Sequence, residues 1–392
     1  MREKRFYGFV DGVIPADETN SYSRRAILMD CVDADAFDNS PATLEDASAL
    51  SLVRTLTTPR RWREDFAVPD VKEGDWVEFS LGKRSGRPRA WEMPASSNYE
   101  AEGSTNLLDI ERHDVRPGRP LADNILKLIR AMKEPLTQVR WARLSDVAQT
   151  FRPSAVSGSR LVIEALDVGQ ASCVVIRVEH GPVLGFFDVG APLYRNQKSF
   201  PANFELPACS SGFVFLSHWD FDHFDLGRRY PELRNLSWFA PPQRVGPNTK
   251  RFQKSLGGKL TFIFGDALSS GSFSFARGTS TTRNDRNGQG YTMRFEQDGE
   301  VVVLTGDVDY AFIPPPTLDG VTSITIPHHG GSGTPPPRPA GGLSRAAASY
   351  GVPNGYKHPD EAFLSYHTGL GWAVSRTATH GSLRRGVRRI FP

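Results

Sequence analysis

A short stretch near the middle of the chain places four side chains of metal-ligand type within six residues. The stretch is Ser217-His218-Trp219-Asp220-Phe221-Asp222-His223, and it directly follows the apolar run Phe213–Leu216. The apolar run predicts a buried strand that delivers the polar residues to a loop. Alternate residues of an extended segment share one face, so His218, Asp220 and Asp222 are expected to point one way, with His223 turned in beside them.

This arrangement suits two adjacent cations. Imidazole nitrogen and carboxylate oxygen both bind zinc, and additional carboxylates favour a harder ion such as manganese. The alternative is a polar turn whose histidines only cap loop ends. Four ligand-type residues after a buried strand favour the metal site, so we predict two divalent metal ions, Zn²⁺ or Mn²⁺.

The same stretch resembles the His-x-His/Asp-x-Asp-His signature of the metallo-β-lactamase fold, in the form with Asp at the second ligand position that marks its ComEC-like, competence-protein branch. The resemblance implies an α/β fold, an αββα sandwich, and a hydrolase activity. The family usually has Gly-Asp where Ala171-Ser172 stand and Gly-Gly where Phe224-Asp225 stand. Further segments match in the family's order over about residues 158–392, namely LDVGQAS (166–172), FFDVG (186–190), VVVLTGDV (301–308), IPHHGG (326–331) and SYGVPNGYKHP (349–359).

The resemblance also implies roles for residues outside the central stretch. Asp307 resembles the family's bridging carboxylate, and His329 would complete a second ion site with Asp222 and His223. Many relatives have a third histidine between His223 and Asp307, and this chain has none there. Asp222 is also expected to act in catalysis. The expected metal ligands are His218, Asp220, Asp222, His223, Asp307 and His329.

Adjacent histidines cannot easily share one ion, because successive side chains of an extended segment diverge. By resemblance His329 is the ligand, which leaves His328 to contact the leaving group or the phosphoryl oxygens. His358 matches a further family histidine and is expected to bind or protonate the substrate, the alternative being a structural histidine that caps the Asn354 loop. Asn287 and Asn354 are the expected polar contacts to the substrate.

Two further aspartates, Asp167 and Asp188, end predicted strands. An aspartate at such a position is more often a turn former. The functional alternative is a carboxylate that accepts a hydrogen bond from a ligand histidine and fixes its orientation.

The start of the chain has a different pattern. The run Lys4–Val10 reads as a strand with Tyr7 and Phe9 on one face, and it resembles the first nucleic-acid-binding motif of cold-shock OB domains. The segment Glu73–Met93 resembles the last hairpin of that fold. We therefore predict a small, mostly-β, OB-like domain over residues 1–95, in which exposed Tyr7 and Phe9 stack on bases. The alternative is that these aromatic residues belong to the core.

The rest of the domain organisation follows from composition. A long polar insertion, residues 33–60, interrupts the OB-like domain. Residues 96–157 are expected to form a helical linker, with an amphipathic helix over Leu121–Glu134 and a boundary near 154–159. Residues 158–392 are expected to form the hydrolase domain.

Composition limits the partners and the location. A net charge of +3 does not by itself indicate a nucleic-acid partner, although arginines concentrate at 59–65, 82–89 and 383–389. No apolar run reaches the roughly 18 to 20 residues that span a bilayer, so no membrane contact is expected. The three cysteines lack paired spacing, which favours a cytoplasmic location.

The sequence therefore predicts a metal-dependent hydrolase, and within that class a phosphodiesterase or nuclease acting on DNA or RNA. Phosphodiesters gain most from two cations, because their transition state spreads negative charge over several oxygens. Two alternatives stay open: hydrolysis of a small phosphoester or cyclic ester in a pocket lined by Trp219 and Phe221, and a nucleic-acid-binding adaptor with a decayed hydrolase domain.

Overall fold

The computed structural model of this chain describes residues 3–14, 25–68, 70–101, 103–113, 122–147, 150, 160–341, 344–381 and 384–391. They pack into two compact units. Unit 1 comprises Met1–Thr137 with Arg244–Ser255, and unit 2 comprises Gln138–Gln243 with Leu256–Pro392. This division differs from the predicted segment boundaries at residues 95 and 157, and the predicted boundary at 154–159 lies outside the described residues.

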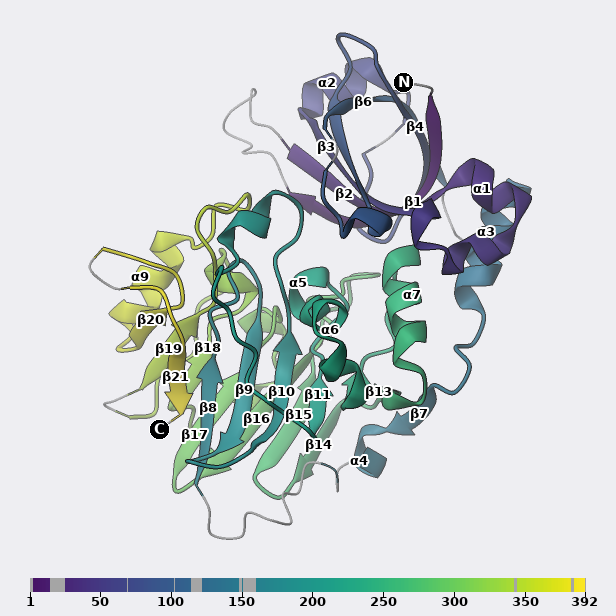
Figure 1. Cartoon of the computed structure of the whole chain (residues 1–392). Coiled ribbons are helices and arrows are strands. Elements are labelled where there is room, and N and C mark those ends of the chain that lie inside the picture. The colour runs from purple at the N-terminus through teal and green to yellow at the C-terminus, as the bar shows by residue number, and fades with distance from the viewer. Residues whose placement is uncertain are drawn as a thin grey trace. The chain divides into compact units, whose positions relative to one another are not determined.

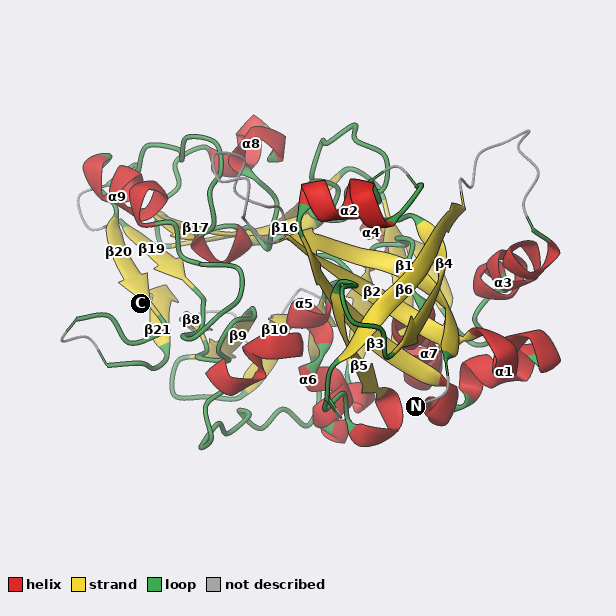
Figure 2. Ribbon diagram, turned by 90° about the horizontal axis from the view of Figure 1, so that it is seen from above, coloured by secondary structure: helices red, strands yellow, loops and turns green. Residues whose placement is uncertain are grey.

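Unit 1 is built on a closed barrel, whose strands are shown in Figure 2. Every described pairing in the barrel is antiparallel, and the strand order is β1-β2-β3-β5-β6-β4. β3 lies inside the predicted polar insertion, and β6 lies inside the predicted linker. The mostly-β expectation is confirmed, while likeness to an OB domain in particular stays a prediction. The strands are β1 (Lys4–Ile14), β2 (Arg25–Asp33), β3 (Leu50–Thr57), β4 (Trp76–Gly82), β5 (Arg89–Pro94) and β6 (Thr105–His113).

The side chains of β1 alternate between two apolar environments. Phe6 and Val10 belong to a cluster formed by several barrel strands. Tyr7 and Phe9 belong to a second cluster, which includes residues of helices α1 (Ala34–Asn39) and α3 (Asp123–Lys133). Tyr7 is 0% exposed and Phe9 is 1% exposed. The expectation that these rings are exposed is therefore wrong, because a ring without an exposed face cannot stack on a base.

The amphipathic helix predicted from residue 121 is confirmed as α3, and it covers this face of the barrel through Ile125 and Leu128. A further helix of unit 1, α2 (Pro59–Asp65), contains one of the arginine concentrations. Two of its arginines form ion pairs within the helix, Arg60 with Glu64 and Arg61 with Asp65. This concentration is therefore partly neutralised by its own helix.

Helix α7 (Pro247–Leu256) begins against a buried carboxylate in unit 1. Asp30 of β2 accepts hydrogen bonds from the backbone N–H groups of Asn248 at 2.8 Å and Thr249 at 3.1 Å. The side chain of Asn248 also donates to Asp30 at 2.7 Å and accepts from the Tyr99 hydroxyl at 2.9 Å. Asp30 thus satisfies N–H groups of the first turn, which lack partners inside the helix.

Unit 2 contains two mixed sheets. In the first, the order is β21-β8-β9-β10-β11-β12-β13-β7, antiparallel from β21 to β10 and parallel from β10 to β7. Its strands are β7 (Arg140–Arg143), β8 (Leu161–Ala165), β9 (Cys173–Val178), β10 (Val183–Val189), β11 (Phe213–Phe215), β12 (Ser237–Ala240), β13 (Leu260–Phe264) and β21 (Arg388–Phe391). β7 therefore brings part of the predicted linker into this sheet.

The second sheet follows the chain in order from β14 to β20, antiparallel as far as β17 and parallel beyond it. Parallel strands need crossover connections, and these loops carry polar residues to the ends of the strands. The strands are β14 (Ala267–Ser270), β15 (Phe273–Arg277), β16 (Tyr291–Gln297), β17 (Glu300–Leu304), β18 (Ser323–Thr325), β19 (Arg345–Ala348) and β20 (Ala373–Arg376).

The two sheets pack face to face. One apolar cluster joins residues of the first sheet, such as Phe187 and Phe215, to residues of the second, such as Phe275 and Met293. A separate cluster joins the other face of the second sheet to Phe363 in α9. Figures 1 and 2 show α5 and α6 on the side of the first sheet away from the second, so the predicted αββα sandwich is confirmed. The helices of unit 2 are α4 (Leu144–Val147), α5 (Phe221–Phe224), α6 (Leu226–Arg229), α8 (Pro315–Leu318) and α9 (Glu361–Gly369).

Within the described residues, no helix combines the length and the apolar character needed to cross a lipid bilayer.

Candidate metal centre

The ligand-type stretch follows the strand β11, as the sequence predicts, but it then enters the first turn of α5 rather than an extended loop. His218 follows the strand and is 0% exposed. Asp220 precedes α5, and its carbonyl accepts a hydrogen bond from the His223 N–H at 2.8 Å, which turns His223 back toward the strand. The backbone of Asp222 lies against Gly190, where a Cβ atom would stand 1.6 Å from the Asp222 carbonyl oxygen. Only glycine fits this approach, so the loop after β10 holds the ligand stretch in place.

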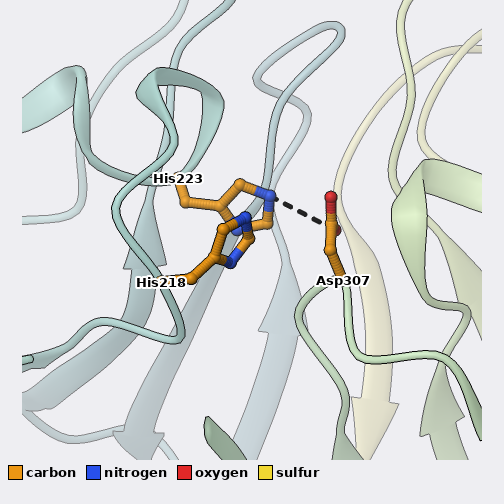
Figure 3. A group of neighbouring side chains, drawn as sticks. All are labelled: His218, His223 and Asp307. Carbon is orange, nitrogen blue, oxygen red and sulfur yellow. Dashed lines mark ion pairs between the residues drawn. The ribbon is translucent and has the colours of Figure 1, made fainter. Parts of the chain in front are cut away.

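The side chains form two ligand groups that share His223. One consists of His218, His223 and Asp307, all buried, and the other of Asp222, His223 and His329. In Figure 3, His218 and His223 face Asp307 across a small space. The Nε2 atom of His223 lies 3.2 Å from an Asp307 oxygen, and that of His329 lies 3.3 Å from an Asp222 oxygen.

Each of these histidines is oriented by an acceptor at its Nδ1 atom. His223 donates to Asp188 at 2.8 Å, and His329 donates to the Ser349 carbonyl at 2.9 Å. The Ser217 hydroxyl donates to Asp188 at 2.9 Å and can therefore accept from His218, whose Nδ1 atom is 2.9 Å away. All three Nε2 atoms are turned toward the carboxylates.

These Nε2 atoms fit a cation. All three are buried and lie 3.2–3.3 Å from a carboxylate oxygen without forming a well-aligned hydrogen bond, although buried polar atoms in folded proteins are almost always well paired. Imidazole nitrogens grouped with carboxylate oxygens are the donor set that zinc and manganese accept. These three nitrogens would hold an ion through their lone pairs.

The pKa shifts of the ligand residues also support a cation at this site. Burial alone would raise the pKa of Asp307, yet His223 and His329 hold it well below its usual value. Burial opposes a charge on His223, but Asp307 and Asp188 raise the pKa of this imidazole well above its usual value. Without an ion, protons on His223 and His329 balance the carboxylates, and a bound cation would displace those protons.

The loops after two neighbouring strands of the second sheet supply Asp307 and His329. Gly306, which follows β17, has a φ of +54°, and a Cβ atom there would lie 2.7 Å from Ser217. His328 and His329 begin the 3₁₀ turn η9 (His328–Gly330), and both have positive φ angles, 51° and 55°. This turn buries His329 and leaves His328 exposed. The predicted divergence of the two side chains is observed, although the backbone is left-handed rather than extended.

Asp220 belongs to neither ligand group. One of its oxygens lies 3.3 Å from Nε2 of His218, and the other lies 2.8 Å from a guanidinium nitrogen of Arg286. Burial would raise the pKa of Asp220, but Arg286 and His218 lower it to about 2. Arg286 was not among the residues predicted from the sequence, although it adjoins the predicted contact Asn287. The described hydrogen bond of Asn287 is through its carbonyl, which accepts from the Gly290 N–H at 3.0 Å.

Two predicted substrate contacts lie on the loop after β19. The Asn354 amide donates to the carbonyls of Gly351 and His358 at 2.6 and 2.7 Å, and its oxygen accepts from the N–H groups of Tyr356 and His358. These bonds make Asn354 an organiser of the loop. The His358 ring lies 5.4 Å from the His328 ring, measured between centroids, so the loop brings His358 to the site.

The two strand-ending aspartates have different surroundings. Asp188 contacts the ligand histidines, as described above. Asp167 forms a two-point ion pair with Arg385, at 2.6 and 2.8 Å, and has no described contact to the ligand groups. Of the two, only Asp188 therefore has the orienting contact that the functional alternative requires.

The ligand residues follow strands of the two sheets in the order in which the family's segments occur along the chain. The His-x-Asp-x-Asp-His segment ends a strand of the first sheet, and Asp307 and His329 follow successive strands of the second, within an αββα sandwich. Unit 2 has the metallo-β-lactamase fold. No family model matches the sequence.

Comparison with individual proteins gives partial similarities. Competence protein ComA of Neisseria gonorrhoeae is 24% identical over 249 residues, which cover 61% of this chain and 34% of that protein. The chain thus spans about a third of the length of this relative. The metallo-β-lactamase fold protein YhfI of Bacillus subtilis matches with a TM-score of 0.35 and 14% identity, covering 59% of this chain and 100% of that one. Zn²⁺-bound PqqB of Methylobacterium extorquens matches with a TM-score of 0.33 and 10% identity, covering 58% and 99%.

Proposed function

We propose that the protein is a metal-dependent hydrolase of phosphodiesters, and in particular a nuclease that acts on DNA or RNA. The observation that carries the proposal is the set of three buried Nε2 atoms that converge on carboxylate oxygens at 3.2–3.3 Å without a well-aligned hydrogen bond, in two groups that include Asp222 and Asp307. Zn²⁺ or Mn²⁺ at the two ligand groups would lower the pKa of a water molecule and polarise the scissile group. Two ions are the predicted full complement.

The protein residues of the site divide into ligands and orienting groups. His218, His223 and His329 would bind through Nε2, while Asp222 and Asp307 would each offer a carboxylate oxygen. Asp188 and the Ser349 carbonyl fix the tautomer in which those Nε2 atoms carry a lone pair. The imidazoles therefore need no rearrangement before they bind.

His358 and His328 are placed to meet the substrate. Burial, and then the neighbouring His328 and His329, lower the pKa of His358 to about 3, so its ring is neutral at pH 7. A neutral imidazole can donate a hydrogen bond to a phosphoryl oxygen, but it does not supply a proton as an imidazolium would. We therefore assign His358 to substrate binding and the exposed His328 to the leaving oxygen.

The choice of phosphodiesters rests on the charge of the transition state, which a cation centre surrounded by imidazole donors stabilises well. Partial similarity to a competence protein supports a nucleic-acid substrate. The alternative of a small substrate depended on a pocket lined by Trp219 and Phe221. These residues are 0% and 4% exposed and both pack against Phe224, so they do not form such a lining.

We also propose a cytoplasmic location. The cysteines Cys31, Cys173 and Cys209 are free in the structure, as expected for a reducing compartment. Cell fractionation with an antibody to the chain would test this, and recovery of the chain outside the cytoplasmic fraction would contradict it.

The test of the proposed function uses the purified full-length chain, stripped with a chelator and reloaded with Zn²⁺ or Mn²⁺. Labelled single- and double-stranded DNA and RNA should be cleaved by the reloaded protein and not by the stripped one. Asp222→Ala and His223→Ala should abolish turnover with the fold intact. Asp298→Asn, an exposed turn residue away from the ligand groups, is the matched control. Equal cleavage by wild type and a folded Asp222→Ala would reject the proposal.

A further inference from the structure

The two ligand groups cannot both be complete, because they share one nitrogen atom. His223 belongs to both groups, and its Nδ1 atom is committed to Asp188 at 2.8 Å. Only Nε2 remains, and a neutral imidazole has one lone pair, which binds one ion. Whichever ion takes His223 leaves the other group with fewer protein ligands.

The group that contains His218 and Asp307 then depends on an additional donor, and the neighbouring carboxylate of Asp220 is already paired with an arginine. Asp220 places one oxygen 3.3 Å from the His218 Nε2 atom, so it is the natural replacement for His223 in that group. Its other oxygen is paired with Arg286 at 2.8 Å. The described ion-pair partner of Asp222, by contrast, is the imidazole of His329, which belongs to the same ligand group.

Arg286 is held firmly in this position. It is 5% exposed, and a second guanidinium nitrogen donates to the Trp219 carbonyl at 3.1 Å. The Gln243 side chain ties the two segments together, since it accepts from the Trp219 N–H at 3.1 Å and donates to the Arg286 carbonyl at 2.8 Å. Arginine keeps its proton in proteins, so a permanent positive charge stands beside Asp220.

We propose that Arg286 makes the two ion sites unequal, with one ion bound tightly by Asp222, His223 and His329 and a second bound weakly on the side of His218 and Asp307. The guanidinium competes with that second ion for the Asp220 carboxylate and repels it, because like charges a few ångströms apart interact strongly at a poorly hydrated site. This inference rests on the metal centre of the proposed function and adds the order in which its sites fill. Arg286 acts here as a positioning residue.

The test is a titration of the chelator-stripped, full-length chain with Zn²⁺ alone, followed by calorimetry and by equilibrium dialysis with elemental analysis. The wild type should bind one equivalent tightly and a second at least about tenfold more weakly. Arg286→Gln should strengthen the second equivalent by about 10- to 100-fold and leave the first unchanged. Arg286→Lys keeps the charge and should retain the inequality. Arg283→Gln, an exposed arginine of the same loop, should behave as the wild type.

Two outcomes would overturn the inference: equal affinity for both ions in the wild type, or no strengthening of the second ion in a folded Arg286→Gln. If Arg286→Gln fails to fold, Arg286→Met removes the same charge and should strengthen the second ion in the same way. His218→Ala tests the assignment of the sites, since it should keep the tight ion and lose the weak one. Loss of the tight ion in a folded His218→Ala would reject the assignment. A chain that binds Zn²⁺ unequally but cleaves no phosphodiester would reject the proposed function and leave this inference standing.

Discussion

Asp188 and His223 form a fully buried hydrogen-bonded pair, with 2.8 Å between a carboxylate oxygen and Nδ1, and both side chains are 0% exposed. The same carboxylate accepts from the backbone N–H and the hydroxyl of Ser217, at 2.8 and 2.9 Å. Asp188 itself has a φ of +56°, a conformation that is costly for a residue with a Cβ atom. A buried carboxylate held in this way orients His223 directly, and His218 through the Ser217 hydroxyl, on the Nδ1 side of each ring.

Replacement of Asp188 should therefore weaken metal binding without removing a ligand. We expect Asp188→Ala to lower Zn²⁺ affinity by about 10- to 100-fold, the usual effect of losing a group that orients a ligand histidine. Competition with a chromophoric chelator measures this. Asp167→Ala, which removes the other strand-ending aspartate, is the control and should leave the affinity unchanged. Unchanged affinity in a folded Asp188→Ala would contradict the orienting role.

Replacing the two adjacent histidines of η9 should have different effects: His329 is expected to affect metal binding and His328 the rate of cleavage. His329→Ala removes a buried donor next to Asp222 and should lower the metal content of the purified protein. His328→Ala should keep the metal content and slow single-turnover cleavage by about 10²- to 10⁴-fold, as expected when a general acid or charge-stabilising contact is lost. Elemental analysis and rates on the same preparations decide between them. Loss of metal in His328→Ala with full metal in His329→Ala would mean that the roles are reversed.

Asp30 should make the stability of unit 1 depend on pH. Burial raises its pKa to about 6 from the ordinary 3.8, although hydrogen bonds from Asn248 and Thr249 oppose the rise. The folded chain therefore holds this proton more tightly than the unfolded chain. The contribution of Asp30 to stability is largest below about pH 4, falls as the pH rises to about 6, and is constant above that, a change of about 1–3 kcal/mol.

Hydrogen exchange of β2 and α7 in the full-length chain measures this effect at pH 4 and pH 7. The comparison is with Asp30→Asn, which cannot ionise. Between pH 4 and pH 7, the amide protection of the wild type should fall relative to that of Asp30→Asn. A difference that does not change with pH would show that Asp30 titrates normally.

The barrel should not fold from residues 1–95 alone. β6 lies at Thr105–His113 and pairs with both β4 and β5, so its removal opens the barrel and exposes two strand edges. The fragment also lacks Asn248, whose side chain is bonded to Asp30 in the full chain. Circular dichroism and amide NMR dispersion of the fragment should show an unfolded chain. A folded 1–95 fragment would contradict the barrel topology.

The metal-ligand stretch could be predicted because residues adjacent to one another in the sequence determine where its strand ends and where its ligands stand. An apolar run followed by ligand-type residues fixes a strand and the chain segment that carries the site, and β11 with His218 and His223 follows that prediction. The predicted shared face of His218, Asp220 and Asp222 is wrong, because the chain turns into α5 at Phe221 and Asp222 lies in a different ligand group from His218. The order of the matching segments likewise predicted the αββα sandwich and the positions of Asp307 and His329.

Features that depend on distant parts of the chain could not be predicted in this way. The alternation of β1 correctly placed Tyr7 and Phe9 on one face, but whether that face meets water depends on α1 and α3. Arg286 was missed because its partner Asp220 is far away in the sequence and the loop that carries Arg286 has no ligand signature. Similarly, nothing in the local sequence of α7 indicates that it packs with Asp30 in unit 1.

The most direct test of the metal centre is a crystal structure of the zinc-loaded protein with anomalous diffraction data at the zinc edge. We expect a strong anomalous peak about 2.0–2.2 Å from the Nε2 atoms of His223 and His329 and from an Asp222 oxygen. We expect a weaker peak, or none, beside His218. A protein that binds no zinc, or a peak that lies away from these three side chains, would contradict the assigned metal centre.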